Sequence, residues 1–338
     1  MSILLLASVT SAIASALLTR AVLNLAISRR LLDVPNERSS HLTPTPRGGG
    51  LAIVIVVSVA LAALVAIGRL ETRSGAIVLL AGAAVAAVGW LDDRRDVSAL
   101  LRILVHAGAV GLALAGTCHL GSLDMPFIPP IPLLEGLLAA FALVWLLNLF
   151  NFMDGIDGIA AGEAVFVALG IAVCLRVGSA DISAALIFAG VLAGAAGGFL
   201  FWNWPPARIF MGDVGSGFLG FSMGALALFA HRSEGLSLWV PTILLAVFVT
   251  DATLTLLRRM LRGERWHAAH RSHAYQWLAR RLKAHLPVTI AVAAVNLAWL
   301  LPLAIMASIF PVQAPILAGI AYLPLIVVTL LVGSGRQE

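Results

Sequence analysis

Long apolar runs recur along the whole chain and are separated by short polar segments. An α-helix needs about 20 apolar residues to cross the hydrocarbon core of a bilayer. Eleven runs are long enough, at residues 2–27, 48–68, 74–91, 99–117, 133–150, 159–177, 182–202, 214–230, 237–257, 287–308 and 312–332. The pattern predicts an all-α, polytopic membrane protein with about eleven transmembrane helices. Residues 1–338 are expected to form a single integral membrane domain without a soluble domain.

The composition agrees with the lipid bilayer as the main solvent of the chain. Hydrophobic residues make up 60% of the sequence and charged residues 12%, and the mean hydropathy is +0.99. A soluble domain carries about 25% charged residues. The net charge is +5, but the basic residues lie in short loops and form no basic stripe with interleaved aromatic residues. No nucleic-acid partner is therefore expected.

The distribution of Lys and Arg predicts the orientation. The first run has no basic residue before Arg20, so we expect a transmembrane helix there and not a signal peptide. Alternating spans with an outside N-terminus place 17 of the 22 Lys and Arg residues on the inside. Because cytosolic loops are enriched in these residues, the N-terminus is predicted to be periplasmic and the C-terminus cytosolic.

Five polar segments of the inner face carry acids, amides, histidines or glycines that a plain connector does not need. They are residues 28–47, 92–98, 148–158, 203–216 and 258–286. In the first of them, DVPNERSSHLTPTPRGGG predicts a shaped, non-helical strap, because prolines and glycines interrupt helices. Its Arg38, His41 and Arg47 are donors suited to phosphate oxygens. The alternative is an ordinary basic loop with turn residues.

Acidic residues mark two further segments. Asp92 and Asp93 in WLDDRRDVS are adjacent carboxylates at a helix end, where mutual repulsion raises one pKa or attracts a cation. Asp213 in RIFMGDVGSG lies between glycines at the start of a helix, an arrangement that suits a metal–diphosphate site. The alternative for both is a solvated helix end.

Polar residues recur at every third position of NLFNFMDGIDG. They are Asn148, Asn151, Asp154 and Asp157. A straight helix would spread this series around its axis, whereas a backbone break at the two glycines would gather it. Polar side chains at the end of a membrane helix are costly and indicate function.

The last large polar loop contains HAAHRSHAYQ, with His267, His270 and His273 three residues apart. Zinc ligation is conceivable, but the nearby arginines favour phosphate binding, and a hydrated basic loop is the alternative. Residues 274–285 are predicted to form an amphipathic helix on the inner surface. Asp251, a lone acid within a predicted span, is either functional or satisfied by neighbouring threonines.

Residue chemistry alone therefore predicts a membrane enzyme with an acid-rich, metal-dependent cytosolic site and cationic loops for a phosphorylated substrate. Hard oxygen ligands favour Mg²⁺, with Mn²⁺ as a second option. An ion- or proton-coupled transporter is the alternative, because transporters also carry ionisable groups and broken helices in the membrane. The motif of CDP-alcohol phosphotransferases does not occur in the sequence.

Four ordered motifs, DVPNERSSHLTPTPRGGG, GWLDDRRDVS, NLFNFMDGIDGIA and RIFMGDVGSGFLG, resemble those of the bacterial polyprenyl-phosphate N-acetylhexosamine-1-phosphate transferases. The resemblance spans residues 33 to about 276. It implies an enzyme of the bacterial inner membrane that transfers an N-acetylated sugar-1-phosphate from a UDP-sugar to undecaprenyl phosphate and releases UMP. Such enzymes initiate O-antigen or other envelope polysaccharides and are often homodimers.

The resemblance also implies residue roles. Asp92 or Asp93 would engage the lipid phosphate, with Asp92 as the base that deprotonates it; a covalent phosphosugar on an aspartate is the alternative. Asp213 and Asp154 would hold Mg²⁺. The substrate-binding residues would be Arg38, His41, Arg47, Asn148, Asn151, Asp154, Asp157, His270, Arg271 and His273. The form HRSHAYQ departs from the HxHHH run of the muramoyl-pentapeptide branch and resembles O-antigen initiators that use N-acetylfucosamine or N-acetylquinovosamine donors.

Overall fold

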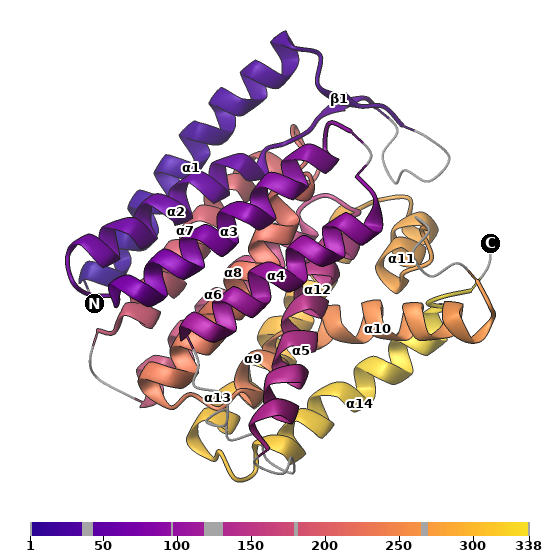
Figure 1. Ribbon diagram of the computed structural model, residues 1–338. Coiled ribbons are helices and arrows are strands. Elements are labelled where there is room, and N and C mark those ends of the chain that lie inside the picture. Colours follow the sequence, from indigo (N-terminus) through magenta and orange to yellow (C-terminus); the bar gives the residue numbers. More distant parts are fainter. Residues whose placement is uncertain are drawn as a thin grey trace.

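A computed structural model describes residues 2–35, 43–95, 97–117, 131–178, 182–264 and 270–336. The described part is almost entirely helical (Figure 1). Its helices and strands are α1 (Ser2–Ser28), β1 (Leu32–Asp33), β2 (Thr45–Pro46), α2 (Gly50–Ala66), α3 (Thr72–Asp92), α4 (Ala99–Thr117), α5 (Pro132–Phe152), α6 (Ile159–Gly178), α7 (Ala184–Asn203), α8 (Asp213–Glu234), α9 (Trp239–Leu244), α10 (Ala246–Leu261), α11 (Ala274–Leu282), α12 (Leu286–Val295), a π-helical turn η1 (Asn296–Leu300), α13 (Leu301–Ile309) and α14 (Ala314–Val332).

The chain is a polytopic, all-α membrane protein. Within the described ranges, nine helical segments are long and apolar enough to cross a membrane, with α12, η1 and α13 counting as one. The helix α2 is apolar but has only 17 residues. The prediction of one continuous helix over 237–257 is wrong, because the chain turns at Leu245 and separates α9 from α10. The number of eleven spans stays a prediction.

Two helices form the centre of the bundle. The most apolar windows of α8 and α7 are 89% and 78% buried, against 17% for α1 and 22% for α14. The helix α8 packs against α2, α3, α5, α6 and α7. Glycine makes this close packing possible, because a Cβ at Gly220 would lie 2.6 Å from the carbonyl oxygen of Leu146. The aspartate that begins α8, Asp213, therefore lies at the end of the central helix.

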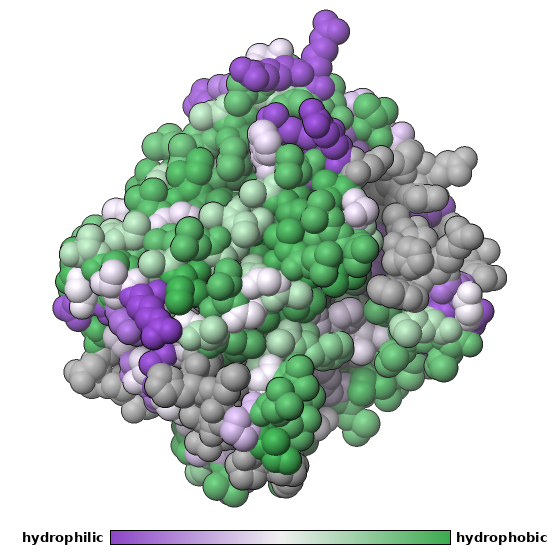
Figure 2. All heavy atoms as spheres, viewed as in Figure 1, coloured by the Kyte–Doolittle hydropathy of each residue, from purple (hydrophilic) through white to green (hydrophobic). Residues whose placement is uncertain are grey.

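The outer helices present their apolar side chains outward. Leu5 and Leu17 of α1 and Leu323 of α14 are more than 60% exposed. Hydrophobic residues dominate the visible face in Figure 2, and hydrophilic residues gather toward its ends. Lipid is the solvent that such a surface requires.

The described residues of the strap before α2, 33–35 and 43–49, are non-helical, as the sequence predicts. Its strands β1 and β2 pair antiparallel, with Leu32 opposite Pro46. The last part of the strap then runs beside the segment that precedes α8, because the amide N–H groups of Gly48 and Gly49 donate to the carbonyl oxygen of Phe210 at 3.1 and 2.9 Å. Two motifs that lie about 160 residues apart in the chain are thereby side by side.

Candidate active site

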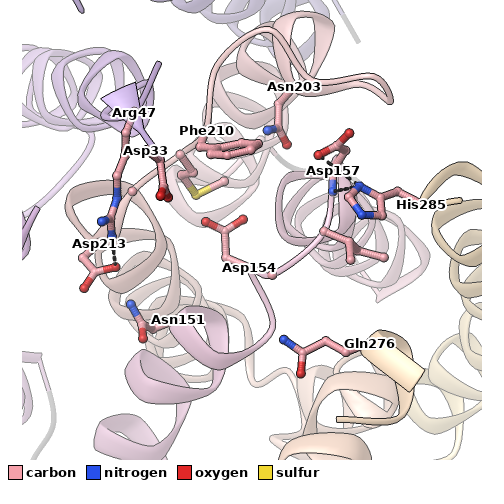
Figure 3. A pocket seen from close by; sticks show the side chains of 14 residues that line it. Asp33, Arg47, Asn151, Asp154, Asp157, Asn203, Phe210, Asp213, Gln276 and His285 are labelled. Carbon is pink, nitrogen blue, oxygen red and sulfur yellow. Dashed lines mark hydrogen bonds and ion pairs between the residues drawn. The ribbon is translucent and has the colours of Figure 1, made fainter. Parts of the chain in front are cut away.

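A cavity of about 210 Å³ opens where the motif-bearing segments meet. Its lining comes from the strap, the turn after α5, the segment between α7 and α8, helix α11 and the start of α12. Figure 3 shows the carboxylate of Asp154 in the middle of a ring of polar side chains. Its labelled polar members are Asp33, Arg47, Asn151, Asp157, Asn203, Asp213, Gln276 and His285, and the aromatic ring of Phe210 lies among them.

Glycines allow the backbone of the strap to approach α8 closely. A Cβ at Gly50 would lie 2.3 Å from the Cα atom of Gly215, and the amide of Gly50 donates to the carbonyl oxygen of Met211 at 2.9 Å. This contact fixes the residues before Gly50 relative to the first turn of α8. Arg47 is consequently held beside Asp213.

Arg47 joins two carboxylates. Its Nε lies 2.9 Å from Asp93 Oδ1 and its Nη2 lies 3.0 Å from Asp213 Oδ1. Asp93 also accepts the backbone N–H groups of Asp213 and Val214, at 2.8 and 3.1 Å. Asp93 therefore caps the N-terminus of α8, where backbone donors lack partners within the helix.

The charges around Arg47 are strongly coupled. Burial raises the pKa of Asp93, although Arg47 and the two backbone donors act in the opposite direction. Burial acts to lower the pKa of Arg47, but the carboxylates of Asp93 and Asp213 outweigh it, and the pKa is raised. The guanidinium is thus permanently charged, while Asp93 is poorly solvated.

Asp92 points to a different partner. Its Oδ1 accepts the backbone N–H of Val97 at 2.9 Å, and its Oδ2 lies 2.5 Å from Arg102 Nη1. The same guanidinium nitrogen lies 3.5 Å from Asp213 Oδ2. From the sequence, Arg102 is only one of the 17 Lys and Arg residues that predict the orientation. Its position in the first turn of the helix that follows the paired acids is the feature that could have indicated a role in the site.

A second cavity of about 70 Å³ adjoins the first. Arg102, Asn148, Asn151 and Asp213 line it, together with apolar residues of α3, α4 and α5 such as Ile103. The two cavities share Asn151 and Asp213, so these residues form the boundary between them. The mixture of a guanidinium, amides and apolar side chains suits the phosphate end of a lipid.

The backbone breaks after α5 as the two glycines of the motif predict. The turn at residues 153–158 separates α5 from α6, and Gly158 adopts a positive φ of 77°. Asp154 consequently points into the larger cavity (Figure 3). Burial, and then the charge of Asp213, raise the pKa of Asp154 well above its ordinary value.

Asp157 and Asn203 hold the far wall of the larger cavity. Asp157 Oδ2 accepts the backbone N–H of Ala207 at 3.0 Å, and its Oδ1 lies 3.2 Å from His285 Nδ1. Asn203 accepts the N–H of Gly158 at 2.9 Å and donates to the carbonyl oxygen of Ile209 at 2.9 Å. These contacts connect the turn after α5 to the segment before α8.

The described histidines of the last loop lie beside the cavity and not in its lining. His273 is buried, with its Nδ1 3.5 Å from Asp251 Oδ1. The ring of His270 stacks on it with centroids 4.9 Å apart. Burial, followed by the neighbouring charges of His273 and Arg259, lowers the pKa of His270 to about 3, so this ring is neutral. Arg271 uses its carbonyl oxygen to accept from Arg280 at 2.7 Å.

The lining also includes side chains that the sequence analysis did not select. They are Asp33, Asn203, Phe210, Gln276 and His285. Gln276 ends the motif HAAHRSHAYQ, and Asn203 directly follows the predicted span 182–202, so both positions carried a signal. Arg38 and His41, which the sequence analysis did select, lie outside the described residues.

The donor set of the larger cavity fits a hard divalent cation. Among the described residues, no three of the His, Cys, Asp and Glu side chains form a group that could hold a metal ion by themselves. Mg²⁺ nevertheless commonly binds through one or two carboxylates and completes its shell with waters and substrate phosphates. Asp154 and Asp213, which face the same cavity, provide such a pair.

Comparison with known proteins identifies the family. A model of glycosyl transferase family 4 matches residues 75–231. The chain is 33% identical over 282 residues to a probable undecaprenyl-phosphate N-acetylglucosaminyl 1-phosphate transferase of Bacillus subtilis, covering 81% of this chain and 77% of the relative. It is 31% identical over 365 residues to the decaprenyl-phosphate N-acetylglucosaminephosphotransferase of Mycolicibacterium smegmatis, covering 97% and 88%.

A third relative comes from another branch of the same enzymes. The chain is 34% identical over 231 residues to the phospho-N-acetylmuramoyl-pentapeptide-transferase of Heliobacterium modesticaldum, covering 63% of this chain and 68% of the relative. The motifs, the cluster of acids and these similarities agree. The chain belongs to glycosyl transferase family 4, within the polyprenyl-phosphate N-acetylhexosamine-1-phosphate transferases.

Proposed function

We propose that this protein transfers an N-acetylated sugar-1-phosphate from a UDP-sugar to undecaprenyl phosphate, giving undecaprenyl-diphospho-sugar and UMP. One observation carries the proposal. In a chain of this family, acids and a guanidinium from segments far apart in sequence converge on one cavity at the helix ends. Membership in a family of transferases also removes the transporter alternative.

The charge of the larger cavity supports a metal-dependent reaction. Its described lining contains four carboxylates, Asp33, Asp154, Asp157 and Asp213, and the single guanidinium of Arg47. A diphosphate is itself anionic and would be repelled by such a lining. Mg²⁺, or Mn²⁺ in its place, would be held by Asp213 and Asp154 and would supply neutralisation of the charge on the diphosphate and on departing UMP.

The donor is expected in the larger cavity. Arg47 donates toward phosphate oxygens from one side, and Asn151, whose amide donates to Ser216 at 3.3 Å, lies on another. The ring of Phe210 provides an apolar face for the uracil base. Asp157 and Asn203 keep this wall in place through their backbone hydrogen bonds.

The acceptor is expected to present its phosphate in the second cavity. Arg102 would bind the phosphate there, and Asp92 would take its proton. The lipid phosphate oxygen then attacks the sugar-side phosphorus of the donor, the bond from that phosphorus to UMP breaks, and UMP leaves. A displacement by the lipid phosphate needs no covalent phosphosugar enzyme, which remains the alternative course.

An apolar groove gives the isoprenoid chain a place in the membrane. It has a volume of about 310 Å³ and lies among α5, α6, α8, α9, α10 and α14. Helix α5 borders both spaces, with Leu149 in the groove and Asn148 in the second cavity. Burial of an isoprenoid here would add affinity in proportion to the apolar area covered.

The orientation and the donor class belong to the same proposal. The excess of Lys and Arg supports a cytosolic active site, eleven spans and a periplasmic N-terminus in the bacterial inner membrane. The form HRSHAYQ places Tyr275 and Gln276 beside the cavity and supports donors of the N-acetylfucosamine or N-acetylquinovosamine kind, for O-antigen or a related polysaccharide. A homodimer is compatible with this proposal.

Release of UMP tests the proposal directly. Purified protein in detergent is incubated with undecaprenyl phosphate, Mg²⁺ and a panel of UDP-N-acetylsugars. The expected result is UMP that requires both the lipid and Mg²⁺, and the best donor identifies the sugar. Folded protein that releases no UMP with any donor would refute the assignment.

A further inference from the structure

Asp251 is a buried acid outside both cavities. It lies on α10 and is only 4% exposed. An isolated buried carboxylate is costly, so its hydrogen-bond partners indicate what it does. Two of those partners are backbone N–H groups of a different element, the start of α11.

The carboxylate of Asp251 holds the first residues of α11. The backbone N–H of Ala274 donates to Oδ1 at 2.8 Å, and that of Tyr275 donates to Oδ2 at 3.0 Å. These are the first two residues of the helix, whose amides have no acceptor within it. A negative charge at this end also complements the helix dipole. Asp251 therefore fixes where α11 begins and how it is rotated.

The helix that Asp251 fixes carries side chains into the donor cavity. Tyr275 Oη donates to the carbonyl oxygen of Phe152 at 2.9 Å, at the start of the turn that bears Asp154. A Cβ at Gly155 would lie 2.1 Å from Tyr275 Oη and 2.9 Å from Gln276 Nε2. Gln276 itself lines the larger cavity (Figure 3).

We propose that Asp251 is a positioning residue for the donor cavity, acting by fixing the start of α11 so that Tyr275 and Gln276 contact the turn after α5. The inference rests on the proposed function for the identity of the donor, a UDP-sugar. The contact between α10 and α11 is independent of that identity. The proposal gives Asp251 a function, which is one of the two alternatives that the sequence leaves open.

A second set of contacts supports the same unit from the C-terminal end. Thr255 donates to Asp251 Oδ1 at 3.1 Å and lies 3.0 Å from the hydroxyl of Ser334. The N–H of Gly335 donates to the carbonyl oxygen of Ser272 at 2.7 Å. Arg258 donates to the carbonyl oxygen of Ser334 at 2.7 Å. The residues after α14 thus bind both α10 and the loop before α11.

Asp251→Asn tests the inference without changing the size of the side chain. One carbonyl oxygen must then serve two backbone donors, and the charge is lost. We expect the KM for the UDP-sugar to rise about tenfold, while kcat and the KM for undecaprenyl phosphate stay within about twofold. Glu163→Gln is the matched control, because Glu163 is 1% exposed in α6 and accepts from Asn296 at 2.6 Å, away from α11. It should leave both KM values unchanged.

Hydrogen exchange of residues 270–282 provides a readout that does not depend on activity. Asp251→Asn should increase exchange in this segment relative to the wild type, and Glu163→Gln should not. If the wild-type protein releases no UMP, the proposed function fails and exchange alone decides the positioning role. Unchanged exchange, or a loss of kcat at constant KM for the donor, would overturn the inference.

Two further variants test the inference when Asp251→Asn does not fold and test the route through Gln276. If Asp251→Asn does not fold, Thr255→Val removes one hydrogen bond to the same carboxylate and is measured by the same two readouts, with smaller effects in the same direction. Gln276→Ala should raise the KM for the donor without changing exchange in α10. Adding Asp251→Asn to Gln276→Ala should then raise the KM by less than the roughly tenfold effect of Asp251→Asn alone, because part of that effect acts through Gln276. Fully additive effects would contradict the proposed route.

Discussion

Arg47 provides the sharpest test of the active site, because it is the one guanidinium among the described residues that line the larger cavity. The change Arg47→Gln keeps a polar side chain but removes both ion pairs, at 2.9 Å to Asp93 and 3.0 Å to Asp213. It also leaves Asp93, which caps α8, without its guanidinium partner, and leaves Asp213 with Arg102 at 3.5 Å as its remaining ion pair among the described residues. Donor binding should suffer directly, through loss of a phosphate donor, and indirectly, through displacement of Asp213.

The size of the expected loss in Arg47→Gln follows from the exposure of the paired side chains. A hydrogen bond to a charged group contributes about 1.5–3 kcal/mol, more where both groups are buried. The side chain of Arg47 is 35% exposed and that of Asp93 is 8% exposed, so one partner is solvated and one is not. A value near the middle, about 2 kcal/mol, corresponds to a loss of about 30-fold in kcat/KM for the UDP-sugar.

The assay is UMP release at saturating undecaprenyl phosphate and Mg²⁺, with the UDP-sugar varied. Arg94→Gln is the matched control, because the guanidinium of Arg94 is exposed and stacks 3.7 Å above the ring of Trp90. It should keep kcat/KM within about twofold, as expected for an exposed charge. A kcat/KM for Arg47→Gln that stays within the same twofold, or an equal loss for Arg94→Gln, would refute the reasoning.

Three further predictions address the metal, the acids and the packing. Asp213→Asn should raise the Mg²⁺ concentration for half-maximal UMP release by about tenfold or more, and should weaken Mn²⁺ binding followed by electron paramagnetic resonance, because one of two carboxylate ligands loses its charge. Burial raises the pKa of Asp154 well above 3.8, so the folded state retains a proton that the unfolded state releases. The free energy of unfolding should therefore fall as the pH rises from about 4 toward the raised pKa. Thermal unfolding in EDTA measures this decrease, which should be smaller in Asp154→Asn. Gly89→Ala should abolish activity and lower the unfolding temperature, since a Cβ there would lie 2.4 Å from the carbonyl oxygen of Asp213, whereas Gly108→Ala, with no atom within 4 Å of its Cβ, should keep activity.

Most of the helical fold could be predicted because lipid imposes a simple length rule. A span must satisfy its backbone hydrogen bonds internally, so apolar runs of sufficient length become helices. The exception, residues 237–257, is as apolar as a span but turns at Leu245, and α10 then places Asp251 against α11. Composition cannot show such a turn, because an apolar run carries no signal for where its helix is interrupted.

The site could be predicted only in part, for a related reason. Motif residues next to glycines, such as Asp154 and Asp213, carry a local signal, since the backbone must break or approach closely there. No local signal of comparable strength marks Arg102, Asn203 or His285, because each becomes a site residue only through packing. Asp92 and Asp93 are adjacent in sequence yet contact different partners, one Arg102 and the other the first amides of α8.

Residue type alone is a poor guide to the roles of the residues in the last polar loop. Histidines three residues apart suggest ligands, but His273 is buried beside Asp251 and its ring stacks on that of His270. Once the buried carboxylate binds the first amides of α11, the next two side chains, Tyr275 and Gln276, reach the turn after α5. His270 and His273 therefore belong to the support of the cavity, whereas Gln276 lines it and Tyr275 contacts the end of α5. Differences in donor among relatives should accordingly follow positions 275 and 276 more closely than the number of histidines before them.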